Sequence, residues 1–135
     1  MIGEIVRHPC VLAVITVGLL VSAASPLPAG SLTSEVDGLR VELASNPSRP
    51  GTRDQTEYVA RLVDRDGRPV TGAQLTLRGG MADGMSVVAP LRPADEAGVY
   101  RGRVLFTMEG RWDLTLRVVR EGRRFELPLT EHVGR

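Results

Sequence analysis

The sequence predicts an all-β protein with an immunoglobulin-like fold, a two-sheet antiparallel sandwich of about seven strands. Two observations predict this class. After residue 35, apolar residues recur at every second position, and the segments that carry them are short and bounded by turn residues. Such alternation buries one face of each strand, and only a second sheet can cover so many apolar faces. A parallel sheet would need helical patterns between its strands, and the sequence shows none.

The alternating segments can be followed one by one along the chain. In the first, Leu39 and Val41 flank Arg40, so apolar and charged side chains face opposite ways. The pattern is clearest in the segment that begins at Trp112, whose indole we expect to fill the core between the sheets. Glu and Gly at 121–122 indicate a tight hairpin before the last segment. The expected strands cover residues 36–43, 56–62, 73–78, 87–91, 100–106, 112–118 and 125–129.

The beginning of the chain has the layout of an export signal. A polar start that contains Arg7 precedes an apolar run over residues 10–24. This run is about 15 residues long, whereas a helix needs roughly 20 to span a bilayer. The small residues Ser22 and Ala24 suit signal peptidase, so we expect cleavage and a mature chain that begins near Ser25. The alternative is a retained helix that associates with the membrane through residues 10–24.

This layout divides the chain into three parts. Residues 1–24 form the signal peptide or membrane-anchor helix, residues 25–34 are rich in Pro, Gly and Ser and predict a linker, and residues 35–135 form the β domain. The domain is therefore expected outside the cytoplasm, in the periplasm, at the cell surface or secreted. Its sequence contains no thiol, because the single Cys10 lies in the apolar run, which excludes disulfides and thiolate metal sites there.

Charge and histidine content exclude several classes of function. The 17 basic residues are all Arg and are nearly balanced by 16 acidic residues, so no broad positive field is available for nucleic acid. His132 is the only imidazole after the apolar run, so neither a His-assisted serine nucleophile nor a multi-His zinc site can form within one chain. Residues 64–67 begin like a calcium loop, but Leu75 stands where its glutamate belongs, and we expect a β-turn. We therefore expect a protein that is not an enzyme.

A methionine-bearing segment is the candidate site that remains. Met81 and Met85 flank a Gly-rich stretch, and Met108 lies at the turn before the segment of Trp112. Methionine normally fills core space, so its place in a turn-rich loop needs a reason. Thioethers are soft ligands that suit Cu(I). The residues alone leave two hypotheses open, copper ligation and ordinary packing, and under the first we expect the two turns to meet at one end of the sandwich.

Three motifs occur in a fixed order around this loop. They are DGRPVTGA at 66–73, AGVYRG at 97–102 and FTMEGRWDL at 106–114. In this order they resemble the YtkA-like and FixH-like domains, which are extracytoplasmic immunoglobulin-like modules linked to copper handling and to the assembly of respiratory oxidases. The resemblance extends over residues 41–129.

The resemblance implies both a function and a site. It implies an exported accessory protein that holds copper or passes it to a membrane partner, either a copper transporter or a respiratory oxidase assembly protein. By position, Met81, Met85 and Met108 inherit the role of copper ligands, with His132 as a fourth. The sequence departs from the family pattern at 80–85, which keeps two methionines and has no proline among them. The alternative function is a metal-free protein-binding module whose edge strand or loops dock a partner.

Overall fold

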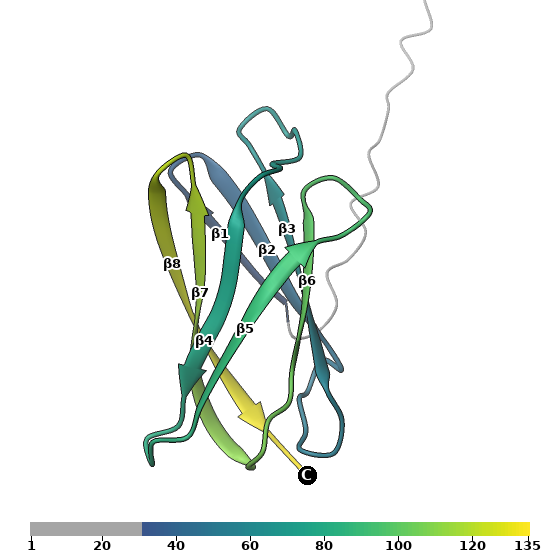
Figure 1. Ribbon diagram of the computed structural model, residues 1–135, viewed down its shortest axis with the longest axis vertical. Helices are drawn as coiled ribbons and strands as arrows, with labels where there is room; N and C mark the ends of the chain where they lie inside the picture. Colours follow the sequence, from purple (N-terminus) through teal and green to yellow (C-terminus); the bar gives the residue numbers. More distant parts are fainter. Residues whose placement is uncertain (1–30) are drawn as a thin grey trace, which may run out of the picture.

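The computed structural model describes residues 31–135, and this part of the chain folds as eight β-strands joined by turns and loops (Figure 1). The helix expected in the signal or anchor lies outside the described residues. Within them, no helix is long and apolar enough to cross a membrane. The strands are β1 (Ser31–Val36), β2 (Leu39–Asn46), β3 (Thr56–Val63), β4 (Gln74–Gly80), β5 (Ser86–Pro93), β6 (Val99–Val104), β7 (Gly110–Arg120) and β8 (Arg123–Val133).

Every strand pairs antiparallel with its neighbours, in the order β1-β2-β3-β6-β5-β4-β7-β8. The all-β antiparallel prediction is confirmed. The hydrogen-bonded order is continuous where the sequence predicts two separate sheets, so the sheet wraps in a barrel-like way around one core. The two ends of the order, β1 and β8, lie close together, and the ion pair between Asp37 and Arg123 joins them near one end of the molecule.

Strand β5 makes the order continuous because it has a partner on each side. Its first part pairs with β4, from Ser86 to Leu91, and its last two residues, Arg92 and Pro93, pair with β6. A side chain at Gly102 of β6 would place its Cβ only 2.7 Å from the carbonyl oxygen of Pro90. Glycine at this position therefore lets β5 cross close to β6 as it leaves β4.

One strand lies where the sequence predicts a linker. Residues 31–34 belong to β1, which pairs along β2 from Ser31 opposite Ala44 to Val36 opposite Leu39. The β1–β2 hairpin turns at Asp37 and Gly38, which have φ angles of 51° and 77°. These angles are those of a tight two-residue hairpin turn, for which Asp-Gly is a favoured sequence.

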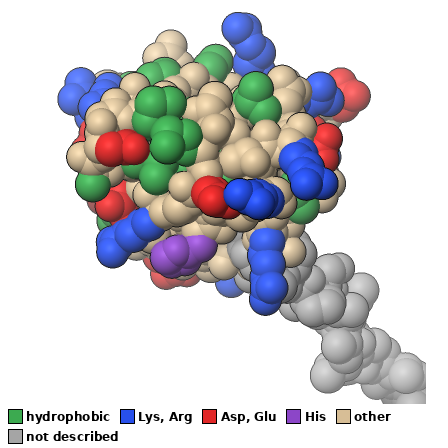
Figure 2. All heavy atoms as spheres, turned by 90° about the horizontal axis from the view of Figure 1, so that it is seen from below, with side chains coloured by type: hydrophobic (Ala, Val, Ile, Leu, Met, Phe, Trp, Pro, Cys, Tyr) green, Lys and Arg blue, Asp and Glu red, His purple; other side chains and the backbone are tan. Residues whose placement is uncertain are grey.

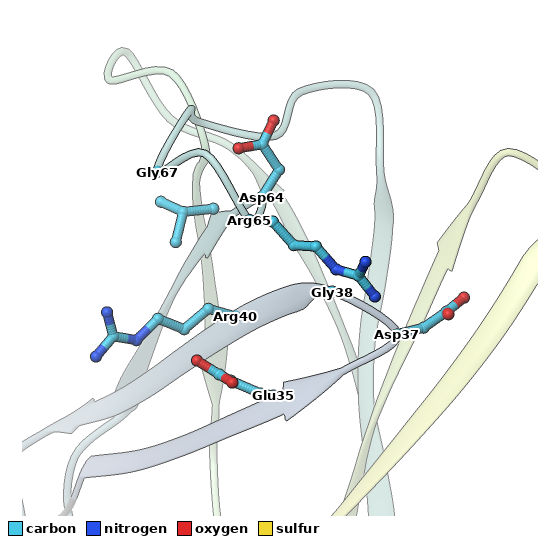
Figure 3. Close-up of a pocket in the computed structure, with 8 residues that line it drawn as sticks. Glu35, Asp37, Gly38, Arg40, Asp64, Arg65 and Gly67 are labelled. Carbon is cyan, nitrogen blue, oxygen red and sulfur yellow. The ribbon is translucent and has the colours of Figure 1, made fainter.

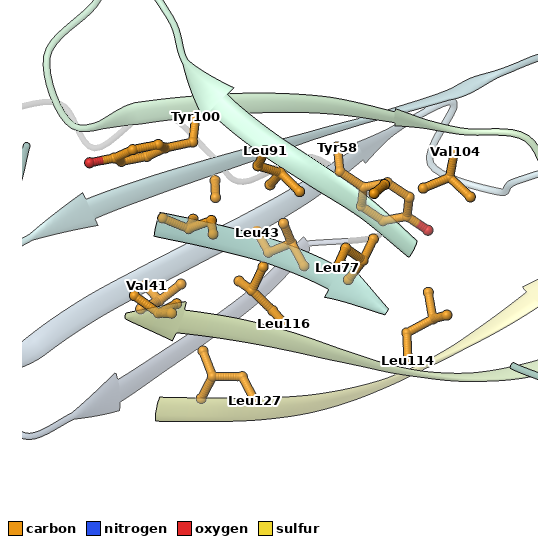
Figure 4. Close-up of a cluster of buried hydrophobic side chains, with 14 of the residues drawn as sticks. Val41, Leu43, Tyr58, Leu77, Leu91, Tyr100, Val104, Leu114, Leu116 and Leu127 are labelled. Atoms are coloured by element: carbon orange, nitrogen blue, oxygen red, sulfur yellow. The ribbon is translucent and has the colours of Figure 1, made fainter. Parts of the chain in front are cut away.

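The core lies between the strands and is built from their inward-facing alternate residues (Figure 4). Trp112 is fully buried, as predicted, and its ring meets that of Phe106 edge to face at a centroid distance of 5.1 Å. The buried hydroxyl of Tyr100 donates to the carbonyl of Val70 at 2.9 Å and accepts from the amide of Ala73 at 3.2 Å. These two bonds fix the connection between β3 and β4 to the core.

Candidate functional site

Two connections that carry methionine lie at the same end of the molecule. They are the β4–β5 loop, residues 81–85, and the β6–β7 segment, residues 105–109, and both lie at the lower end in Figure 1, where the chain also ends. We call this the methionine end and define it by Met81, Met85 and Met108. Its two connections are held by hydrogen bonds within the β4–β5 loop, by a hydrogen bond from Trp112 and by a close contact at Gly110.

The β4–β5 loop is closed by its own backbone. The amide of Met81 donates to the carbonyl of Met85 at 2.8 Å, and the amide of Gly84 donates back to the carbonyl of Met81 at 3.2 Å. The amide of Met85 also donates to Oδ1 of Asp83 at 3.3 Å. A Cβ at Gly80 would overlap the carbonyl oxygen of Met85, so glycine is required where the hairpin closes. The loop thus holds Met81 and Met85 opposite one another.

The β6–β7 segment is fixed to the core through its backbone. The indole Nε1–H of Trp112 donates to the carbonyl oxygen of Met108 at 3.0 Å. A buried indole N–H needs an acceptor, and Met108 supplies one from the surface. The side chain of Met108 itself stays 43% exposed. Its position at the surface is therefore set by a residue of the core.

The two connections lie side by side. A Cβ at Gly110 would lie 2.8 Å from the Cε methyl of Met81, and Gly110 follows Met108 by two residues. Gly110 has a φ of 129°, a conformation that side chains rarely adopt, so the backbone at this position favours glycine. Met81 is half-buried and packs on the core, whereas Met85 is 36% exposed. The geometry brings the segments of all three methionines together.

His132 lies at the same end but on a different face. In the β7–β8 register Gly110 is opposite Val133 and Arg111 is opposite His132. The side chain of His132 is exposed, whereas Val133 is buried and Glu131 is half-buried. His132 therefore projects from the outer face of β8, while its neighbours face inward. The assignment of the three methionines and His132 as metal ligands stays a prediction.

Figure 2 views the molecule from the methionine end, where hydrophobic side chains lie among Arg, Asp and Glu. Within residues 31–135, the large hydrophobic side chains that are exposed lie between Met85 and Met108, and they include Val88 and Leu105. Among residues 31–135, no group of three or more His, Cys, Asp and Glu side chains is arranged to hold a metal ion.

A second polar feature, which the sequence did not indicate, lies between β3 and β8. The hydroxyl of Tyr58 donates to Oε1 of Glu131 at 3.1 Å, although the residues are 73 positions apart. Burial raises the pKa of Glu131 above its usual value, and the hydrogen bond from Tyr58 lowers it by less. Burial, together with the charge of Glu131, also raises the pKa of Tyr58. The pair borders a pocket of about 270 Å³ lined by Ser31, Leu32, Leu43, Tyr58, Leu129, Thr130 and Glu131.

A larger, charged hollow of about 520 Å³ lies at the opposite end of the molecule (Figure 3). Two of its acidic residues have partners, Asp37 in Arg123 of β8 and Asp64 in its own turn. Oδ1 of Asp64 accepts the backbone amides of Asp66 and Arg68, each at 2.9 Å, which is the turn expected in place of a calcium loop. The lining residues are Glu35, Asp37, Gly38, Arg40, Val63, Asp64, Arg65 and Gly67.

Comparison with known proteins places this fold. It is similar to the crystal structure of a DUF4426 family protein from Pseudomonas aeruginosa PAO1, with a TM-score of 0.58 and 15% identity over 78% of this chain and 95% of that chain. The Lin-41 filamin domain is similar with a TM-score of 0.48 and 18% identity, over 80% of this chain and 95% of that chain. At these identities the likeness concerns the fold alone. No curated protein sequence matches the chain.

The YtkA-like family model matches residues 33–117. The matched region begins in β1 and ends in β7, so it contains both methionine-bearing connections and the strands that position them. It covers more than half of the chain. The protein is therefore a member of the YtkA-like family.

Proposed function

We propose that this chain is an exported, non-enzymatic accessory protein with an immunoglobulin-like domain that binds Cu(I) at its methionine end. The observation that carries the proposal is the contact of the Met81 methyl with Gly110, because it places the β4–β5 loop against the segment of Met108. Three thioethers thereby share one end of the molecule. Thioether sulfur is a soft ligand that suits Cu(I), and unlike a thiol it does not form disulfides in an oxidising compartment.

The rigidity of the two backbones supports this role. The β4–β5 loop is closed by hydrogen bonds at Met81 and Met85, and the carbonyl of Met108 is held by Trp112. A site on fixed backbone loses little conformational entropy when its side chains converge on an ion. Methionine side chains are flexible, so the sulfur atoms can turn toward one ion without movement of the loops.

Exposure of the outer thioethers suits transfer of the ion. Met85 and Met108 are exposed, so an incoming ligand from another protein can reach an ion that they hold. The partner in this proposal is a membrane protein, either a copper transporter or an assembly factor of a respiratory oxidase, as for the FixH-like domains. Export by residues 1–24 would bring the domain to the outer face of that membrane.

The proposal is tested by Cu(I) titration of the exported protein under reducing conditions, followed by X-ray absorption spectroscopy. Sulfur scatterers are expected at about 2.3 Å, a typical metal–sulfur distance. Met81→Leu with Met85→Leu should abolish them, and Met108→Leu should reduce their number. Leucine conserves volume, so each change should cost less than about 1.5 kcal/mol of stability.

Two controls make the outcome decisive. Val88→Leu alters an exposed apolar residue near the same loops without removing sulfur, so copper uptake should be unchanged. His132→Asn tests the fourth predicted ligand independently of the methionines. Loss of a nitrogen scatterer in this variant alone would identify His132 as a copper ligand. Equal copper uptake by the wild type and the Met81/Met85/Met108 leucine variant would end the copper proposal. The metal-free protein-binding module would then be preferred.

A further inference from the structure

The outer faces of β5 and β6 form one exposed surface with a distinct composition. Alternation along the two strands places three residues of each on this side, and all six are exposed. We call this surface the β5–β6 face and define it by its residues: Val88, Pro90 and Arg92 from β5, and Arg101, Arg103 and Leu105 from β6 and the residue that follows it.

Two arginines stand directly opposite one another on this face. Arg92 is the register partner of Arg101, so their Cβ atoms are neighbours on the same side of the sheet. Like charges in this position destabilise a strand pair. Arg103 lies two residues beyond Arg101 and therefore projects from the same side. The face thus concentrates three positive charges in a protein whose net charge is only +1.

One acidic residue, Glu57, interacts with two of these arginines. Glu57 of β3 accepts Nη1 of Arg101 at 2.9 Å through Oε1, and its Oε2 lies 4.0 Å from Nε of Arg103. Within residues 31–135, Arg92 forms no ion pair. Glu96, in the loop that follows β5, also acts on Arg101 but is paired with Arg61 at 2.7 Å. The three guanidinium groups of the face thus share Glu57 and part of the charge of Glu96, which leaves a surplus of positive charge.

The same face exposes apolar side chains. Val88 is 73% exposed and Leu105 is 49% exposed. β5 and β6 approach closely at Gly102, where a Cβ would lie 2.7 Å from the carbonyl of Pro90. Along both strands, this point lies between the arginine pair and the apolar residues Val88 and Leu105. Exposed apolar residues beside arginine are typical of protein–protein interfaces, in which arginine is enriched and lysine is depleted.

We propose that the β5–β6 face docks an acidic segment of a partner protein, a segment in which carboxylates are interspersed with apolar side chains. The carboxylates pair with Arg92 and Arg101 and remove the repulsion between them, and the apolar side chains cover Val88 and Leu105. The face is the surface of a sheet, and the adjoining loop, residues 94–98, carries Asp95 and Glu96 and no large apolar side chain that could enter lipid, which favours a protein over a membrane as the occupant. This interaction needs no metal and goes beyond the copper proposal.

The probe for this proposal is a fluorescein-labelled synthetic peptide in which glutamate alternates with leucine, measured by fluorescence anisotropy against the exported protein. Binding should weaken as salt is raised, because the pairs are exposed. Arg92→Gln with Arg101→Gln should raise the dissociation constant about tenfold, since each exposed pair contributes up to about 1 kcal/mol. The matched control, Arg68→Gln with Arg124→Gln, removes two exposed arginines from other faces and should leave binding unchanged.

Two further measurements decide between the outcomes. Val88→Thr with Leu105→Gln should also weaken binding, and Arg92→Gln alone should raise the urea midpoint of the free protein, because it removes one of two like charges.

Equal binding of a peptide with lysine in place of glutamate, or an equal effect of the control pair, would overturn the proposal. So would sedimentation of the wild type, but not of the Arg92/Arg101 variant, with phosphatidylserine vesicles, since that result assigns the face to a membrane. Copper uptake by the Arg92/Arg101 variant should match the wild type, so the two proposals fail separately.

Discussion

The indole N–H of Trp112 donates to the carbonyl oxygen of Met108 at 3.0 Å, which ties the centre of the core to the surface of the methionine end. Trp112 is fully buried and is held in place by the ring of Phe106. The position of Met108 is therefore a property of core packing as well as of its own loop. Substitutions in the core around Trp112 should therefore shift the backbone at Met108.

The first prediction concerns Trp112. Trp112→Ala should lower the free energy of unfolding by about 3 to 5 kcal/mol, because it empties a large buried volume. Trp112→Phe keeps most of the ring but leaves the carbonyl of Met108 without its donor, and should cost less. Urea unfolding of the two variants measures both effects. A loss below about 1 kcal/mol for Trp112→Ala would be incompatible with a buried indole.

The second prediction concerns the closure of the β4–β5 loop. A methyl group at Gly80 overlaps the backbone carbonyl of Met85, so Gly80→Ala should open the loop and cost about 1 to 3 kcal/mol. Nuclear magnetic resonance should show changed amide signals at Met81 and Met85. Gly67→Ala is the control, because Gly67 has open space around it and only its φ of 76° opposes a side chain. Unchanged loop signals in Gly80→Ala would contradict the close approach.

Period-two alternation predicted seven of the eight strands in residues 31–135, because this alternation reflects the burial of one face of each strand. The alternation did not predict strand β1, and the reason is physical. Its inward positions are Leu32, Ser34 and Val36, so a serine interrupts the apolar series. The Asp37-Gly38 pair, a favoured hairpin-turn sequence, was the feature that could have indicated a strand before it. The continuous strand order was not predictable, since it depends on the crossing of β5 over Gly102, a contact between strands that no local pattern records.

The candidate site also has features that could be predicted from the sequence and features that could not. The presence of Met81, Met85 and Met108 in turns could be seen from the sequence, and the four-residue spacing of Met108 and Trp112 makes their hydrogen bond a local feature. The pair of Tyr58 and Glu131 could not be foreseen. Alternation predicts that Tyr58 faces inward, but its partner is brought to it by the order of the strands.

The third prediction concerns export. We expect the mature chain to begin near Ser25, after the small residues at 22–24. Because β1 begins at Ser31, this cleavage would leave intact all eight strands that the structure describes. Mass spectrometry of the exported protein gives the terminus directly. Recovery of material that still begins at Met1 and remains with the membrane would show that residues 10–24 act as an anchor.

The last prediction concerns the pH dependence of stability, which the half-buried Glu131 should shape. Burial raises its pKa in the folded state above the ordinary value of the unfolded chain. Between these two values the folded protein holds a proton that the unfolded chain has released, so the free energy of unfolding falls as pH rises through this window and remains lower above it. Glu131→Gln keeps an acceptor for the Tyr58 hydroxyl but cannot titrate.

Urea unfolding of wild type and Glu131→Gln across a pH series isolates this contribution. Relative to the variant, the wild type should be most stable at the acid end and should lose that advantage as pH rises through the window. Tyr58→Phe removes the hydrogen bond that lowers the pKa of Glu131, so the loss should extend to higher pH in that variant. Glu126→Gln, an exposed change on the same strand, is the control and should retain the decline caused by Glu131. Parallel pH profiles for wild type and Glu131→Gln would show that Glu131 titrates alike in the folded and unfolded chains, and that its carboxyl is solvated in the folded protein.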